Sequence, residues 1–217
     1  MIANIHEGIE PTLKAAIVVC NSFNMIDDLE KWKTLLAQTE VIYENTDHLW
    51  TQSSSQLLEY QNKTGVTLPS EYKEFCQIFG SGSFTKNEFQ IFCPDPTDEG
   101  RGPVSSEDAI VAIKESYPYP EEVHELLDSS YMFGVGNGFI FFLFDLRTYS
   151  DLDKSYDIYL VDDEINNSVH YLGRSFFEFI QEMCLGERAT LEFPMLKNRA
   201  ESDDGDVTED ERFGFKP

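Results

Sequence analysis

Apolar residues recur at helical spacing in six segments of the chain. The clearest segment, Tyr72 to Phe79, places its apolar side chains on one face, between a proline that can open a helix and a glycine that can end it. Capping-box patterns at Ser53 and Ser175 indicate two further helix starts. The predicted helices begin at Asn24, Ser53, Pro69, Ser105, Pro120 and Ser175, and the last of them ends at Gly186.

Strands are predicted where apolar residues alternate or run together between turn residues. Asn137-Gly138 predicts a tight hairpin, because both residues tolerate positive φ. The second arm of this hairpin is apolar at every position, so we expect both of its faces to be covered and the strand to lie centrally in the sheet. The predicted strands are Glu88–Phe92, Tyr131–Gly136, Phe139–Phe144, Tyr156–Val161 and Val169–Leu172.

The two ends of the chain differ from its middle. Residues 1–50 are predicted to form an extension with one amphipathic helix, ahead of a domain at 51–192. The stripe Met25, Leu29, Trp32 and Leu36 is expected to pack on the chain's own domain, with a partner helix as the alternative. Residues 193–217 form an acidic tail that we expect to be disordered, with Phe213-Gly-Phe215 as a candidate docking element.

Charge narrows the choice of partners. The chain has 40 acidic and 16 basic residues, a net charge of −24 and a sequence pI near 4.3. Direct nucleic-acid binding and attachment to an anionic membrane are therefore excluded as functions, because both need clustered Lys and Arg. The electrostatic field of so negative a chain attracts a basic protein and can raise its association rate. A high net charge can equally serve only to keep a protein soluble.

The acids cluster around the predicted strands. Seven acids and two bases lie between Asp145 and Glu164, and the loop 94–103 adds three more acids. We therefore predict a sheet with an acidic rim that binds a basic protein. The predicted partner-binding residues are Asp95, Asp98, Glu99, Asp151, Asp153, Asp157, Asp162, Asp163 and Glu164.

Signs of catalysis are missing from the sequence. The four histidines are scattered, and neither glycine-rich stretch has the context of a phosphate-binding loop. The chain is therefore expected not to be an enzyme and to need no cofactor or metal, with a hard cation held at 151–157 or 162–164 as the alternative. Four separated cysteines, Cys20, Cys76, Cys93 and Cys184, predict reduced core residues, and the absence of a signal or membrane-spanning segment predicts a cytoplasmic protein.

Several of these segments together resemble the SUKH superfamily of yeast cell-wall regulators and bacterial immunity proteins. The similar segments are Leu68-Pro69 with Tyr72 and Phe75, Gly80-Ser-Gly-Ser-Phe84, the hairpin from Phe133-Gly134 to Phe144-Asp145, and Ser175-Phe176 with Phe179. The resemblance implies an α+β domain whose mostly antiparallel β-sheet packs against helices. It also implies an immunity protein that neutralises a cognate toxin, with a nuclease as the favoured class because a nuclease must carry a basic cleft. A regulatory or scaffolding module of the same superfamily is the alternative.

Overall fold

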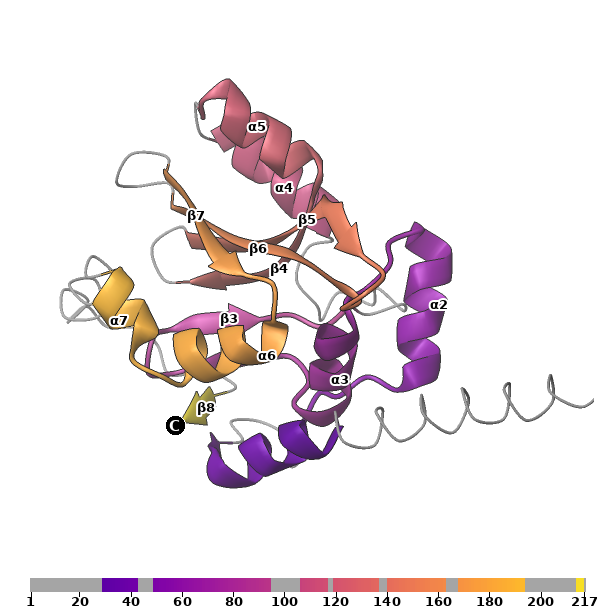
Figure 1. Cartoon of the computed structure of the whole chain (residues 1–217), viewed down its shortest axis with the longest axis vertical. Coiled ribbons are helices and arrows are strands. Elements are labelled where there is room, and N and C mark those ends of the chain that lie inside the picture. The colour runs from indigo at the N-terminus through magenta and orange to yellow at the C-terminus, as the bar shows by residue number, and fades with distance from the viewer. Residues whose placement is uncertain are drawn as a thin grey trace, which may run out of the picture.

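An eight-stranded sheet runs through the molecule between two layers of helices (Figure 1). The computed structural model describes residues 29–42, 49–94, 106–116, 119–136, 140–162, 168–193 and 214–216. All neighbouring strands are antiparallel except β2 and β8, which are parallel, so the predicted α+β class with a mostly antiparallel sheet is confirmed. The strand order is β1 (Glu40–Ile42), β8 (Gly214–Lys216), β2 (Gly82–Phe84), β3 (Phe89–Ile91), β4 (Ser130–Gly136), β5 (Ile140–Ser150), β6 (Ser155–Asp162) and β7 (Ser168–Gly173).

Strand β5 explains why a fully apolar segment belongs in the middle of this sheet. It pairs with β4 on one side and β6 on the other, and its first six residues are all buried. Ile140, Phe142 and Phe144 face one hydrophobic core, whereas Phe141 and Leu143 face a second core on the opposite side. The predicted hairpin and the central position of its second arm are therefore confirmed, while the turn residues 137–139 lie outside the described part.

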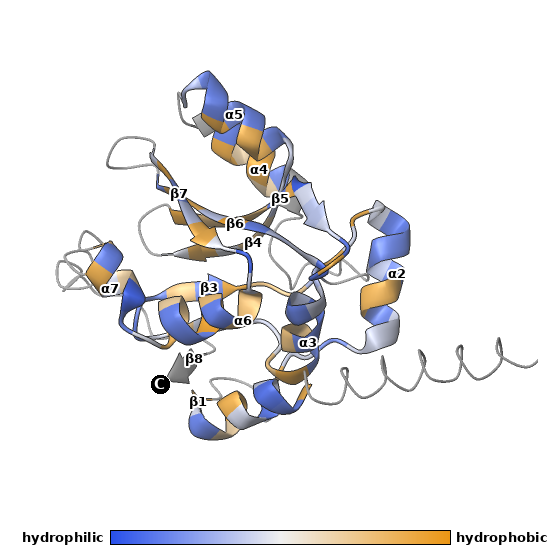
Figure 2. Cartoon of the chain, in the orientation of Figure 1, coloured by the Kyte–Doolittle hydropathy of each residue, from blue (hydrophilic) through white to orange (hydrophobic). Residues whose placement is uncertain are grey.

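Helices α4 (Ser106–Ser116) and α5 (Glu121–Asp128) cover one face of the sheet. Both occupy the predicted positions, and they bury Ile110, Val123 and Leu127 against the outer side of β4 and β5. Figure 2 shows polar and apolar residues alternating along both helices, as expected of helices with one buried face.

The opposite face carries the larger core. Helix α2 (Ser54–Thr64) starts with the predicted capping box of Ser53 and Gln56 and ends at Gly65, whose φ of 75° is left-handed. Helix α3 (Ser70–Ile78) follows Pro69, and the predicted inward stripe from Tyr72 to Phe79 is completely buried. Helices therefore begin and end where the caps and the glycine predict.

Trp32 joins the N-terminal part of the chain to this core. It lies in the helix over residues 29–38, has no exposed surface, and packs edge-on against Phe75, Phe79 and Phe177 with ring centroids 5.6, 6.0 and 4.8 Å away. Trp32 and Leu36 of this stripe pack on the chain's own core as predicted, whereas Leu29 is only partly buried and lies outside that core. Asn24 and Met25 lie outside the described residues.

The last predicted helix differs from a regular α-helix. Ser175 caps α6 (Phe176–Glu178) through the backbone N–H of Glu178, as predicted, but the chain then continues as the π-helical segment η1 (Phe179–Cys184). Leu185 N–H donates to Ile180 O at 3.0 Å, which is an i to i+5 bond. This wider turn brings four of the six residues of η1 into the core: Phe179, Ile180, Met183 and Cys184.

Four short elements were not predicted. They are β1, β2, β8 and α7 (Arg188–Glu192). Gly80 makes the predicted turn with φ 78°, but Gly82 already belongs to a strand. Residues 214–216, which overlap the candidate docking element Phe213-Gly-Phe215, pair with β1 and β2 of the same chain.

Candidate protein-binding surface

Arg174, just after β7, holds the turn between β5 and β6. Its Nε donates to Asp153 Oδ2 at 3.1 Å and its Nη1 to Asp157 Oδ1 at 2.6 Å. Its Nη2 donates to the carbonyl oxygens of Thr148 and Ser155, each at 3.0 Å. One guanidinium therefore ties together the end of β5, the turn and the start of β6.

The carboxylates in and near this turn pair with neighbouring cations, which lowers the pKa of Asp153 and of Asp145. Partial burial would raise the pKa of Asp153, but hydrogen bonds, chiefly from Arg174, outweigh it and hold the pKa at about 2. Asp151 pairs with Lys154 at 2.8 Å. Asp145 is buried, which would raise its pKa, yet a two-pronged contact from Arg147 at 2.9 and 2.8 Å lowers it.

The part of the predicted acidic rim that the structure describes is compensated or buried within the chain. Asp151, Asp153 and Asp157 all pair with Lys154 or Arg174. Asp162 is 1% exposed, so it cannot present a carboxylate to a partner without rearrangement. The other predicted partner-binding residues, Asp95, Asp98, Glu99, Asp163 and Glu164, lie outside the described residues. The described part of the rim is therefore better explained as a structural ion-pair network.

Uncompensated acids occur instead on α5. Glu121, Glu122 and Glu125 are exposed, and within the described part of the chain none of them forms an ion pair. The nearby Lys114 contacts Asp128. Two of the three acids lie in the first turn, where the helix dipole favours negative charge, so they also have a structural role. We call Glu121, Glu122 and Glu125 the α5 acidic face.

An aromatic patch lies on the outer face of β6 and β7, at the margin of the core that α4 and α5 cover. Tyr171 is 56% exposed and Val169 is 37% exposed. The Tyr171 ring meets Tyr159 edge-on with centroids 5.6 Å apart. We call Tyr159, Val169 and Tyr171 the β7 aromatic patch. The sequence pointed the other way, because alternation along Val169-His170-Tyr171 would place the apolar Val169 and Tyr171 inward, whereas the structure exposes both.

Arg147 connects the two features. The hydrogen bond to Asp145 is the main reason why the pKa of the Arg147 guanidinium is raised. Glu125 of the α5 acidic face and Tyr159 of the β7 aromatic patch raise it further through their charges. Tyr159 also packs against the core that α4 and α5 cover, so the α5 acidic face and the β7 aromatic patch lie on the same side of the sheet, with Arg147 within electrostatic reach of both. Carboxylates next to exposed tyrosines can pair with Lys and Arg and also bury apolar surface.

The described residues give no sign of a metal site, a reactive cysteine or a membrane-spanning helix. No group of three His, Cys, Asp or Glu side chains among them is arranged to hold a metal ion. Cys76, Cys93 and Cys184 are free and buried, as predicted, and burial raises the pKa of the Cys76 and Cys184 thiols well above the ordinary value. Within the same residues, no helix has the length and apolar character needed to cross a membrane.

A family model matches the middle of this chain. The model of the SMI1 / KNR4 family (SUKH-1) matches residues 52–182, which is more than half of the chain. The matched region runs from the residue before the Ser53 cap into η1, and so includes strands β2 to β7 and helices α2 to α6. No match was found among curated proteins.

Proposed function

The chain belongs to the SMI1/KNR4 (SUKH-1) family, and on that premise we propose that it is an immunity protein that binds and neutralises a cognate toxin. Its action would be stoichiometric binding, not catalysis. A nuclease is the favoured target, because a nuclease holds phosphates in a basic cleft that a carboxylate-rich surface can occupy. The cell compartment that fits this role is the cytoplasm, where such a toxin acts.

The observation that carries the proposal is the surface formed by the α5 acidic face and the β7 aromatic patch. Its carboxylates have no ion pairs among the described residues, whereas Asp151, Asp153 and Asp157 are already paired. Uncompensated charges act at a distance and steer a basic partner, which raises the association rate. Exposed tyrosines act after contact, because a buried aromatic side chain slows dissociation. The acids would thus raise the association rate and the aromatic patch would lower the dissociation rate, and together these give a low Kd.

The test is the binding of a catalytically inactive form of the toxin encoded beside the chain's own gene. The variant E121Q/E122Q/E125Q removes three charges from the α5 acidic face. The control E30Q/E40Q/E59Q removes three charges from the helix over residues 29–38, from β1 and from α2, and thus leaves the net charge of the two variants equal. Association and dissociation rates are measured by surface plasmon resonance at low and high salt.

We expect the α5 variant to associate about tenfold more slowly at low salt, and the difference to vanish at high salt. We expect the control to lose less than about twofold. Y171A should raise the dissociation rate and leave the association rate nearly unchanged. Equal slowing by both triple variants would show that only net charge matters, and the α5 surface would be rejected as the contact site.

The alternative is a regulatory or scaffolding module of the same family. The β7 aromatic patch is compatible with this function, because an exposed aromatic surface can bind a protein partner of any charge. Genomic neighbourhood and co-expression distinguish the two functions. A toxin gene beside this one, with survival restored on co-expression, supports immunity. Failure of co-expression to protect cells from that toxin would contradict the immunity proposal.

A further inference from the structure

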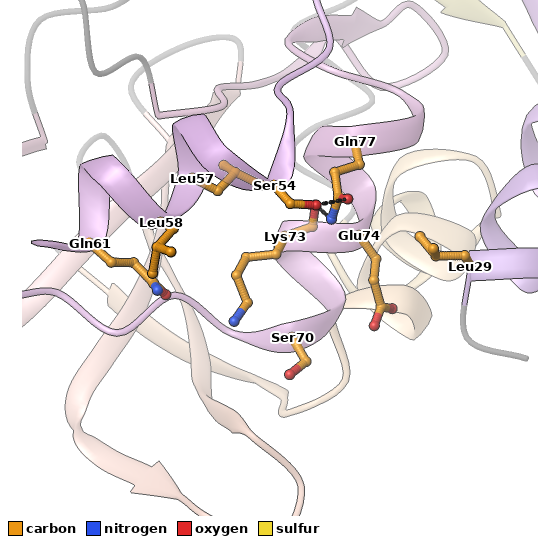
Figure 3. A pocket seen from close by; sticks show the side chains of 9 residues that line it. All are labelled: Leu29, Ser54, Leu57, Leu58, Gln61, Ser70, Lys73, Glu74 and Gln77. Atoms are coloured by element: carbon orange, nitrogen blue, oxygen red, sulfur yellow. Dashed lines mark hydrogen bonds between the residues drawn. The ribbon is translucent and has the colours of Figure 1, made fainter. Parts of the chain in front are cut away.

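A groove of about 320 Å³ lies between α2 and α3 (Figure 3). Each helix lines it with four residues at i, i+3, i+4 and i+7 spacing, from Ser54 to Gln61 on α2 and from Ser70 to Gln77 on α3. This spacing places the four side chains of each helix along one face, so the two helices form opposite walls. Leu29, the first described residue of the chain, closes one end of the groove.

The groove combines an exposed apolar surface with an unpaired cation. Leu58 is 55% exposed, although its neighbour Leu57 is buried. Lys73 is half-buried and forms no ion pair within the described part of the chain. Among the lysines and arginines whose side chains the structure describes, only Lys73 and the exposed Lys63 lack a carboxylate partner.

The neighbours of Lys73 do not form an ion pair with its ammonium group. Burial lowers the pKa of its ammonium group, Glu74 opposes that shift, and Lys154 adds to it. Glu74 already accepts a hydrogen bond from Trp32 Nε1 at 3.1 Å. Lys73 thus keeps a half-buried positive charge without an ion pair, to which an acidic group could add a favourable contact.

The sequence before Leu29 contains the groups that this groove lacks, in the matching order. Figure 3 shows Leu29 at one end, Glu74 and Lys73 next, and Leu58 and Gln61 at the other end. Immediately before Leu29 come Asp27 and Asp28, and the apolar run 15–20 precedes them. The other long segment outside the described residues, 194–213, is rich in acids, with seven among its twenty residues, but lacks such an apolar run.

We propose that residues 15–28 of the same chain occupy this groove, with Asp27 and Asp28 beside Lys73 and the run from Ala15 to Cys20 against Leu57 and Leu58. Two helical turns make a groove about 10 Å long, and fourteen residues span about 20 Å even as a helix, so the segment is long enough. The occupant is attached to one end of its own site, which favours it over any free peptide. This inference does not depend on the proposed function.

Cys20 provides a direct test in the full-length chain. Cys76, Cys93 and Cys184 are buried, so Cys20 is the thiol whose reaction with a disulfide reagent reports on residues 15–20. In the native protein we expect Cys20 to react at least about tenfold more slowly than in urea. L58D should remove most of this protection. The matched control L191D, at a leucine of α7 that is 76% exposed, should retain it.

Charge exchange tests the acidic contact separately. K73E should expose Cys20, and K73E/D27K/D28K should restore its protection, with folding of each variant checked by circular dichroism. Full reactivity of Cys20 in the native protein would overturn the proposal, as would equal effects of L58D and L191D. Protection that rises with protein concentration would assign the groove to a second copy, and protection that appears only with the toxin would assign it to the partner.

Discussion

Replacing Arg174 by methionine tests whether the β5–β6 turn depends on one guanidinium. The substitution keeps the apolar stem but removes two ion pairs and two hydrogen bonds to backbone carbonyls. Partly exposed ion pairs contribute less than about 1 kcal/mol each. Each lost charge-assisted bond to a carbonyl oxygen costs about 1 kcal/mol. We therefore expect R174M to lower the free energy of unfolding by about 2–3 kcal/mol, measured by urea denaturation at pH 7.

The control is K63M, which removes the same charge from an exposed lysine without an ion pair and should cost less than about 0.5 kcal/mol. The pH dependence gives a second check. The pKa of Asp153 is about 2 in the folded chain, against an ordinary value of 3.8. Its ion pair therefore stabilises the fold above pH 3.8 and is lost as the pH falls toward 2. The difference between native chain and R174M should shrink from pH 7 to pH 3, and a constant difference, or a loss equal to that of K63M, would refute the reasoning.

Two further substitutions test how the helices are held. W32A should lower the free energy of unfolding by about 3–5 kcal/mol in urea denaturation, because it empties a fully buried site, whereas L152A at a 97% exposed position should cost less than about 0.5 kcal/mol. Gly80 and Gly65 have similar φ of 78° and 75°, but a Cβ on Gly80 would lie 2.2 Å from Trp50 O and one on Gly65 would meet nothing within 4 Å. Thermal denaturation should therefore show a cost of about 1 kcal/mol for G65A and a much larger one for G80A, and equal costs would mean that the close approach to Trp50 does not matter.

The elements that could be predicted are those whose signals are local. Ser53 with Gln56, Pro69, and Ser175 with Glu178 act within four residues, so the helix starts follow from the sequence alone. Strands β1, β2, β3 and β8 have three residues each, and only β3 was predicted, from the alternation over Glu88 to Phe92; the other three were not distinguished from loops. The π-helical turn of η1 could not be predicted either, because its apolar spacing also fits an α-helix.

The candidate site was less predictable than the fold, because charge compensation is a long-range property. Asp153 and Asp157 meet Arg174, which lies 21 and 17 residues further along the chain. The sequence shows an excess of acid around them, but the fold decides which acids are paired. Glu121, Glu122 and Glu125 are spaced so as to lie outside the buried Val123, Leu126 and Leu127, and only the structure shows that they form no ion pair among the described residues.

The position of β8 has a consequence for the folding rate. β8 lies between β1 and β2, and within the described residues β1 pairs with no other strand. The pairing of Glu40 with Lys216 joins residues 176 positions apart (216 − 40), and closing so large a loop costs conformational entropy before any contact compensates it. We expect this edge of the sheet to assemble last, after the hairpin of β4 and β5 has formed. During synthesis, β1 would therefore remain without a strand partner until residues 214–216 have left the ribosome.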